Sequence, residues 1–505
     1  MRAETVGVAL EHAAGRGKAF LYDGEGTVTY AEFDELTDRV AGGLLARGIT
    51  RGDRIGLLGL NTPQWLAAFF GAARIGAVAV PLNVRYRERE LSHMLGQSGA
   101  RMVISLGAVP DFDFAAFYES FGIPAVPFGA GFDELTADLP DAVALAAARG
   151  AVSSSDPLMI LYTSGTTGRP KGAVITHGSI LASAYAQADH FAMSEGDVQL
   201  GHLPLNHVGG ITCTVMASLV SGGSVALLPA FSPEAALRAI ERHRVTYLGA
   251  VPTMYVLMLG RPDLADHDVS SVRLCIAGGS NVEPALADAV RRAFPGAPLY
   301  GLYGLSESSG ACVLSPVDDD PETVSRTLGA IIGDFEARVV DQEGDALPSG
   351  EGGELQIRGA CVTAGYWDMP DETAEVFLPG GWLATGDMVA MEPDGHLVLR
   401  GRKKEMYIQG GFNVYPVEIE NVLTAHPKVA MAAGIGVPDR VLGEVGRFYI
   451  VPRQDTEPPT PEELTAYCRD RLADYKVPRE FVITPDVPLT PVGKIHKALL
   501  KERDS

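Results

Sequence analysis

Short runs rich in Val, Ile and Leu alternate with longer amphipathic segments through the first three hundred residues of the chain. The run at 54–60 is followed by a helix-like segment at 62–75 and then by another apolar run at 77–82. The same order returns at 224–228 and 232–244, where a Ser-Pro pair can start the helix. Short buried strands that alternate with helices form parallel sheets covered by helices. The alternation therefore predicts an α/β protein.

Turn residues come closer together from about residue 320. Turn sequences at 348–350 and 393–395 enclose short strand-like runs, which is typical of an antiparallel sheet. A basic run at 400–404 follows, and a new mixed segment of helices and strands begins after it. The length of 505 residues also requires more than one domain. We predict a large N-terminal domain of parallel-rich sheets with helices plus a small β region at 1–400, a hinge at 401–404, and a small mobile α+β domain at 405–505.

The composition excludes some classes of partner. The chain carries 41 basic and 63 acidic side chains, for a formal net charge of −22. Nucleic acid binding needs Lys- and Arg-rich surfaces, so nucleic acid is not an expected partner. An anionic small molecule would have to be held by local donors and a metal, because the overall field is negative.

Cysteine use and apolar patterning bear on location. The five cysteines are scattered without close pairs, which fits a reducing compartment, and the first twenty residues hold charges and no apolar core. The uncharged stretch 208–231 is long enough to span a membrane, but glycines and Pro229 interrupt it. It is better interpreted as a buried helix, a turn and a strand. We expect a cytoplasmic protein, monomer or homodimer, without a transmembrane segment.

A loop rich in glycine and hydroxyl residues follows the apolar run at 157–162. It reads Tyr-Thr-Ser-Gly-Thr-Thr-Gly-Arg-Pro-Lys-Gly over 162–172. Glycines let backbone N–H groups approach a phosphate closely, and consecutive N–H groups form an anion-binding nest. The loop differs from the Walker P-loop, in which lysine stands directly before Ser or Thr. The candidate phosphate-binding residues are Thr163, Ser164, Gly165, Thr166, Thr167, Gly168 and Lys171.

This loop strongly resembles the signature loop of the adenylate-forming superfamily, which contains acyl-CoA synthetases, adenylation domains of nonribosomal peptide synthetases and firefly luciferase. Further motifs follow in the family's order, so the resemblance covers about 27–500. It implies that a carboxylate attacks the α-phosphorus of MgATP to give an acyl-adenylate and pyrophosphate. A thiol, coenzyme A, then displaces AMP. Charge neutralisation and alignment dominate such chemistry. The implied cofactors are ATP, Mg²⁺ and coenzyme A.

The resemblance also assigns residues to the nucleotide. Gly-Gly-Ser at 278–280 is similar to the family's adenine-flanking loop, and Tyr-Gly-Leu-Ser-Glu at 303–307 is similar to the motif that stacks on adenine, binds the α-phosphate and ligates Mg²⁺. Thr-Gly-Asp at 385–387 supplies a carboxylate for the ribose hydroxyls. The implied nucleotide residues are Gly278, Gly279, Ser280, Tyr303, Gly304, Ser306, Asp387 and Arg402, with Glu307 and Thr163 at the metal.

Motifs in the C-terminal part imply a movement. Lys404 falls at the family's hinge position, and Gly410 and Gly411 lie in the loop that enters the site for the second half-reaction, where the pantetheine arm would pass. The sequence Pro-Leu-Thr-Pro-Val-Gly-Lys-Ile at 488–495 resembles the loop that carries the adenylation lysine, here Lys494. In the family the C-terminal domain rotates after adenylation, which also shields the intermediate from water. The implied catalytic residues are Lys494, Glu307 and His207.

The acid substrate is less constrained. The segment at 203–207 resembles the family segment that ends in a histidine at the acyl pocket, although Asn206 replaces the usual aromatic residue. Gly301 and Leu302 also depart from the family pattern, which predicts a reshaped pocket. An apolar lining disfavours a small dicarboxylate and leaves fatty, aryl and alicyclic acids. The candidate pocket residues are His207, Val208, Gly210, Val251, Met254, Gly301 and Leu302.

Two alternatives stay open at this point. The acceptor in the second step could be a carrier protein, an amine or another nucleophile in place of coenzyme A. A non-catalytic nucleotide sensor on the same fold is a different class of function. The joint presence of Lys494, Glu307 and Asp387 argues against the sensor.

Overall fold

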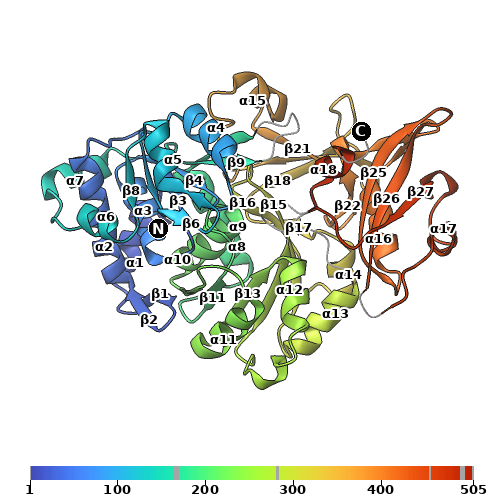
Figure 1. Ribbon diagram of the computed structural model, residues 1–505, viewed down its shortest axis with the longest axis horizontal. Helices are drawn as coiled ribbons and strands as arrows, with labels where there is room; N and C mark the ends of the chain where they lie inside the picture. The colour runs from blue at the N-terminus through green and yellow to red at the C-terminus, as the bar shows by residue number, and fades with distance from the viewer. Residues whose placement is uncertain (1, 164–169, 280–283, 454–455, 489–494, 503–505) are drawn as a thin grey trace.

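The computed structural model describes residues 2–163, 170–279, 284–453, 456–488 and 495–502. A large sheet runs through the middle of the N-terminal part (Figure 1) and is parallel at its centre, with antiparallel pairs at both edges. The predicted alternation of strands and helices is confirmed. The strand order is β17 (Ala330–Ile331), β16 (Gly310–Leu314), β15 (Leu299–Leu305), β14 (Leu274–Gly278), β13 (Tyr247–Ala250), β11 (Val198–Gly201), β12 (Ser224–Leu227), β1 (Ala19–Asp23) and β2 (Gly26–Thr29).

A second sheet lies beside the first in the N-terminal part. Its strands are parallel except for the β10–β9 pair, which flanks the predicted phosphate loop. Helix α8 (His177–His190) follows β10 and packs against β16 of the first sheet. The strand order is β10 (Lys171–Thr176), β9 (Pro157–Thr163), β4 (Val78–Leu82), β3 (Arg54–Leu58), β5 (Met102–Ser105) and β8 (Ala125–Pro127).

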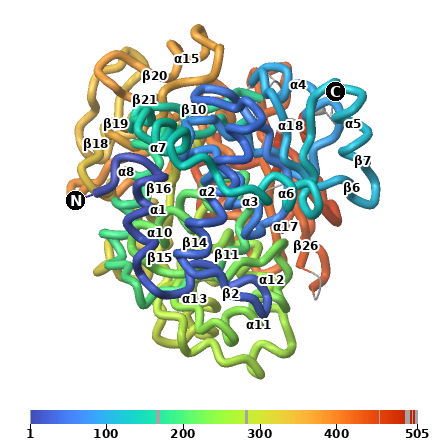
Figure 2. The backbone as a smooth tube through the Cα atoms, turned by 90° about the vertical axis from the view of Figure 1, so that its left-hand side faces the viewer, coloured from blue at the N-terminus to red at the C-terminus, as the bar shows by residue number. Residues whose placement is uncertain are grey.

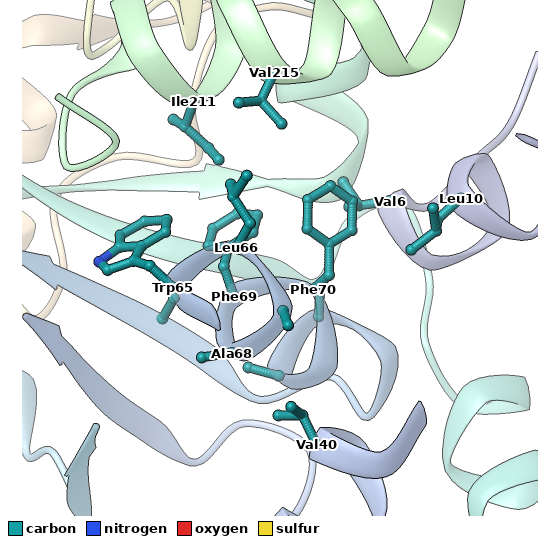
Figure 3. Close-up of a cluster of buried hydrophobic side chains, with 14 of the residues drawn as sticks. Val6, Leu10, Val40, Trp65, Leu66, Ala68, Phe69, Phe70, Ile211 and Val215 are labelled. Atoms are coloured by element: carbon teal, nitrogen blue, oxygen red, sulfur yellow. The ribbon is translucent and has the colours of Figure 1, made fainter. Parts of the chain in front are cut away.

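Helix α3 (Pro63–Arg74) is buried over almost its whole surface. The Thr62 hydroxyl accepts a hydrogen bond from the Trp65 amide, and proline at the first position starts the helix. Figure 3 shows its aromatic side chains between α2 (Tyr30–Ala46) and the segment that carries Ile211 and Val215. Burial of each large apolar side chain contributes roughly 1.5–3 kcal/mol, so this cluster fixes the second sheet to the first.

The segment 208–231 is folded inside the protein. It forms α9 (Val208–Gly210), a π-helix at Ile211–Met216, α10 (Ala217–Ser221) and then β12. The predicted helix, turn and strand are confirmed. Among the residues that the structure describes, no helix is long and apolar enough to cross a membrane.

Antiparallel strands follow, as the turn spacing predicts. They form a third sheet with the order β18 (Glu336–Val340), β19 (Gly352–Arg358), β21 (Trp382–Met391) and β20 (Phe377–Leu378), to which β22 (Leu397–Arg402) adds beside β21. The last part of the chain forms another five-stranded sheet, in which β24 (Phe412–Val414), β23 (Tyr407–Gln409), β26 (Gly443–Pro452) and β25 (Val429–Asp439) are neighbours in that order and β27 (Glu480–Ile483) adds beside β26. It packs with α16 (Pro416–Thr424), α17 (Pro461–Arg469) and α18 (Lys497–Glu502).

The predicted fold class is confirmed, whereas the domain limits stay a prediction. A 3-10 helix at Lys403–Glu405 connects β22 to the C-terminal sheet, which lies at the right of Figure 1. In Figures 1 and 2, α11 (Pro233–His243), α12 (Pro252–Leu259) and α13 (Pro284–Ala293) lie at one end of the molecule and α15 (Pro370–Val376) at the other. The hairpin of β15 and β16 lies between them.

Candidate active site

Neighbouring parallel strands of the first sheet end at residues from separate sequence motifs. β11 leads into the segment of His207, β13 leads to Val251, and β14 ends at Gly278. β15 runs past that end and carries Tyr303. Ligands of open α/β sheets bind at the carboxyl ends of the strands. The structure thus gathers the predicted adenine and acyl residues at the edge of the sheet where a ligand is expected.

The nucleotide candidates Tyr303, Asp387 and Arg402 are joined by one hydrogen bond and one ion pair. The Tyr303 hydroxyl donates to Asp387 Oδ2 at 2.7 Å, and Arg402 Nε lies 2.9 Å from Asp387 Oδ1. Asp387 and Arg402 stand opposite each other on β21 and β22, and the Asp387 side chain is 2% exposed. Burial, and then the Asp387 charge, raise the pKa of Tyr303 well above its usual range, so the phenol stays a donor. This set joins the first sheet to the third.

Glu307 lies in the turn between β15 and β16 and is held by a residue that the sequence analysis missed. The Tyr366 hydroxyl donates to Glu307 Oε1 at 2.8 Å, and the Thr363 amide donates to the Glu307 carbonyl at 2.9 Å. Tyr366 belongs to the segment 364–367, whose backbone bonds to Gly172 and Val174 of β10. No local pattern marks Tyr366, because the contact joins positions far apart in the chain.

Lys171 is the first residue of β10 and is 8% exposed. It stands opposite Thr163, the last residue of β9, so these two predicted phosphate residues are paired across the mouth of the loop. The Lys171 ammonium lies 5.2 Å from the centre of the Tyr366 ring. Within the described ranges no carboxylate forms an ion pair with it, which leaves a buried cation suited to an anionic ligand. Ser164, Gly165, Thr166, Thr167 and Gly168 lie outside the described residues.

Magnesium would depend on Glu307 and on the nucleotide itself. The described parts of the chain contain no group of three or more His, Cys, Asp or Glu side chains arranged to hold a metal. Mg²⁺ is commonly held by one or two carboxylates together with substrate phosphates and waters, and a single carboxylate in a nucleotide site fits that pattern. The assignments of Glu307 and Thr163 to the metal stay predictions.

Two of the predicted glycines have a cause in packing. A Cβ at Gly304 would lie 2.0 Å from the Gly310 carbonyl oxygen across the hairpin, and a Cβ at Gly210 would lie 2.3 Å from the Pro204 carbonyl oxygen. Both positions therefore require glycine with or without a ligand. Gly279, with φ of 85°, occupies the left-handed region that favours glycine. Ser280 lies outside the described residues, and Ser306 lies half-buried in the turn of Glu307.

Some of the acyl-pocket candidates are half-buried and could line a pocket, whereas others are packed in the hydrophobic core. His207 is half-buried at the start of α9, and its Nδ1 accepts a hydrogen bond from the Gly209 amide at 3.1 Å. The π-helix that follows is a form often found at functional sites. Val208 is buried in the core around α3. The half-buried candidates Val251, Met254, Gly301 and Leu302 follow or belong to the strands of the ligand edge.

The C-terminal candidates occupy a hairpin and its approach. Gly410 and Gly411 form the turn between β23 and β24 with φ of 60° and 88°, values that a two-residue hairpin turn demands of glycine. Lys404 is exposed in the middle of the 3-10 helix. On either side of it, Lys403 pairs with Glu354 at 2.9 Å and Glu405 pairs with Lys497 at 2.7 Å. Lys494 lies outside the described residues.

Comparison with known proteins agrees with this geometry. Residues 10–367 match the family model of the AMP-binding enzyme, and residues 418–494 match that of the AMP-binding enzyme C-terminal domain. The chain belongs to the AMP-binding enzyme family. The predicted superfamily is thereby confirmed, while the roles of individual residues stay predictions.

Relatives within the AMP-binding enzyme family match over nearly the whole chain. A feruloyl-CoA synthase of Amycolatopsis sp is 37% identical over 94% of both chains. A methyl-dioxo-octahydroindenyl-propanoyl:CoA ligase of Mycobacterium tuberculosis is 37% identical over 93% of both. ATP-bound MatB from Rhodopseudomonas palustris superposes with a TM-score of 0.90 at 28% identity, covering 100% of this chain and 99% of that one. The same relative in its apo form gives 0.79, so the present arrangement is nearer to the ATP-bound one.

Proposed function

We propose that this protein is an ATP-dependent acyl-CoA synthetase that activates an apolar carboxylic acid as an acyl-adenylate and passes the acyl group to coenzyme A. The observation that carries the proposal is the set of Tyr303, Asp387 and Arg402, joined by a hydrogen bond and an ion pair, at the ligand edge of the parallel sheet that also carries the turn of Glu307. Membership in the AMP-binding enzyme family supports adenylation, and the printed names of the relatives support coenzyme A as acceptor.

The residues suggest how the nucleotide would be bound. The Asp387 carboxylate accepts one hydrogen bond at Oδ2 and pairs with Arg402 at Oδ1, but a carboxylate offers about four acceptor positions, so it can also accept from ribose hydroxyls. Arg402 orients that carboxylate through their ion pair. Lys171 lies buried at the base of the phosphate loop, where its charge would stabilise the leaving pyrophosphate. Bound Mg²⁺, held by Glu307 and phosphate oxygens, would neutralise further charge on the triphosphate.

The pocket supports an acid with an apolar acyl part. Val251, Met254 and Leu302 bring only hydrocarbon and thioether groups to the edge of the sheet. A second carboxylate would therefore find no counter-charge among them. The relatives named for feruloyl and octahydroindenyl-propanoyl groups favour aryl or alicyclic acids over long fatty acids.

Pyrophosphate release with a panel of acids tests the first half of the proposal. Ferulate and other aryl acids, alicyclic propanoates, fatty acids and malonate form its arms. We expect ATP-dependent release with aryl or alicyclic acids and none with malonate. No release with any acid would contradict adenylation and favour the nucleotide sensor.

A second panel tests the acceptor. With the best acid, coenzyme A, a carrier protein carrying phosphopantetheine and simple amines are compared by AMP release and by the mass of the product. An acyl-CoA product is expected. An amide or a carrier-bound thioester formed faster than acyl-CoA would replace coenzyme A in the proposal.

We also propose a reducing, cytoplasmic location for this enzyme, as a monomer or a homodimer. The five cysteines are all buried and free, which supports a compartment without disulfide formation. Light scattering of the purified protein would distinguish the two oligomeric states.

A further inference from the structure

Two opposite charges of the candidate site meet the same aromatic ring. The Lys171 ammonium lies 5.2 Å from the centre of the Tyr366 ring, and the hydroxyl of that ring donates to Glu307 Oε1 at 2.8 Å. Among the described residues, no ion pair joins the Lys171 ammonium to the Glu307 carboxylate. Tyr366 thus contacts the predicted phosphate cation and the predicted metal ligand at once.

The Tyr366 ring is fixed in place from several sides. Its amide donates to the Thr373 hydroxyl at 2.9 Å, and its ring makes an edge contact with Phe377 at 5.5 Å. On either side of it, the Gly365 carbonyl accepts from Val174 and the Trp367 amide donates to Gly172, which binds the segment to β10. The backbone of Tyr366 is thus held on β10, and its ring is held by Phe377 and by the hydrogen bond to Glu307.

Separation of the charges has a clear chemical consequence. A direct Lys171–Glu307 ion pair in this half-buried region would satisfy both groups and withdraw them from a triphosphate and its metal. A phenol orients the carboxylate through a hydrogen bond but leaves its negative charge, and an aromatic face attracts the ammonium without neutralising it. A phenol is protonated at neutral pH, so the Tyr366 hydroxyl is the donor in its contact with Glu307 Oε1.

We infer that Tyr366 is a positioning residue that keeps Lys171 and Glu307 apart, so that the lysine stays available to nucleotide phosphate and the glutamate to Mg²⁺. The inference rests on the proposed function, because it takes MgATP as the ligand of both residues. It differs from a purely structural role for Tyr366, in which loss of the ring would affect all nucleotide binding equally.

Calorimetric titration with ATP, once with Mg²⁺ and once with a chelator, provides the test. The measured quantity is the ratio of the two affinities, which isolates the magnesium-dependent part and needs no acid substrate. Tyr366→Leu should lower this ratio about tenfold, the scale of one charged contact. Tyr366→Phe keeps the ring that contacts the Lys171 ammonium and loses only the hydrogen bond to Glu307, so its ratio should fall less than that of Tyr366→Leu.

Variants that lack Lys171 show whether pairing of Lys171 with Glu307 causes the fall in the ratio. Lys171→Met weakens phosphate binding with and without Mg²⁺, so its ratio should stay close to that of the unmodified protein. In the Lys171→Met protein, adding Tyr366→Leu should lower the ratio far less than Tyr366→Leu lowers it in the unmodified protein, because the lysine that could pair with Glu307 is absent. Tyr185→Leu is a matched control. It also removes a ring that faces a cation, here Arg2 at 5.0 Å, and a hydroxyl that accepts a hydrogen bond from the Ala3 amide.

The outcomes separate the two proposals. An unchanged ratio in Tyr366→Leu, or an equal loss with and without Lys171, would overturn the role of Tyr366 while nucleotide binding by the unmodified protein stands. If the unmodified protein binds no ATP under either condition, the proposed function fails and this inference fails with it. Thermal unfolding of each variant identifies any loss of binding that reflects misfolding. If Tyr366→Leu misfolds, the ratio in Tyr366→Phe decides, and an unchanged ratio in that variant would overturn the role of Tyr366.

Discussion

A single carboxylate, Asp387, stands where two sheets and the predicted ribose site come together. The phenol of Tyr303 reaches it from the first sheet, and the guanidinium of Arg402 reaches it from the neighbouring strand. Because the side chain is 2% exposed, its charge is tolerated only through these partners. Its orientation is therefore set before any nucleotide arrives.

Asp387→Asn should raise the KM for ATP in pyrophosphate release by about 10–100-fold, because hydrogen bonds to charged groups contribute roughly 1.5–3 kcal/mol. The amide keeps the shape of the side chain but loses the ion pair with Arg402. Initial rates over a range of ATP concentrations measure the effect. Tyr303→Phe removes only one donor to Asp387 and should cost less. An unchanged KM in Asp387→Asn would remove this residue from the nucleotide site.

At the scale of elements, the β23–β24 hairpin and the loop of Lys494 are proposed to alternate in the site. Lys494→Ala should slow adenylate formation by several powers of ten, about 3–5 kcal/mol, because a key stabilising charge is lost. It should spare thioester formation from supplied acyl-adenylate. Single-turnover assays of each half-reaction measure this division. Equal loss in both would count against rotation about the hinge at 401–404.

Gly411→Leu should show the reverse division, with pyrophosphate release retained and thioester formation lost. A side chain there would narrow the path of the pantetheine arm, and φ of 88° adds backbone strain. Gly344→Leu is a matched control, because Gly344 has φ of 91° and, like Gly411, no atom within 4 Å of the added Cβ. Normal coenzyme A turnover in Gly411→Leu, or equal loss in the control, would refute the assigned role.

A half-buried charge cluster ties the start of α18 to the 3-10 helix that connects β22 to the C-terminal sheet. Lys497 Nζ lies 2.7 Å from Glu405 and 2.7 Å from Glu420, and Glu420 also accepts from the Gly434 amide at 2.6 Å. Lys497→Met would leave two half-buried carboxylates without their cation, which should destabilise the C-terminal part by about 1–3 kcal/mol. Hydrogen exchange of α16 and β25 should accelerate accordingly. Lys497→Arg should restore protection, and unchanged exchange in Lys497→Met would show that the cluster adds no stability.

At the scale of the whole molecule, the sequence predicts elements that depend on neighbouring residues and misses contacts between residues far apart in the chain. The strand-like runs form the parallel sheets and the helix-like runs form the helices that cover them. These elements could be predicted because apolar periodicity and helix caps, such as the Thr62 cap of α3, are local features of the sequence. The Tyr366–Glu307 contact spans 59 positions and the Lys497–Glu405 pair spans 92, so neither leaves a local signal. The nucleotide residues could be assigned, as predictions, only because several motifs occur in the order of a known family.

Two buried histidines should make the N-terminal part sensitive to acid. Burial lowers the pKa of His177 and of His202 to about 4. His177 Nδ1 accepts a hydrogen bond from the Val6 amide at 3.2 Å, which a protonated ring would lose. Below about pH 6.5 the unfolded chain binds protons at these positions and the folded chain does not, so stability falls as pH drops toward 4. The Asp156–Arg51 pair, whose carboxyl pKa is lowered to about 2, is lost only at lower pH.

The expected slope is at most about 1.4 kcal/mol per pH unit for each histidine. Urea unfolding between about pH 7 and pH 5 measures it, and fluorescence follows the N-terminal part selectively, because the three tryptophans are Trp65, Trp367 and Trp382. Glutamine does not titrate and can accept the Val6 hydrogen bond, so His177→Gln combined with His202→Gln should flatten the slope over this range. A slope that survives in the double variant would assign the acid sensitivity to other groups, and an equal loss of stability at every pH would show that the histidines act through packing alone.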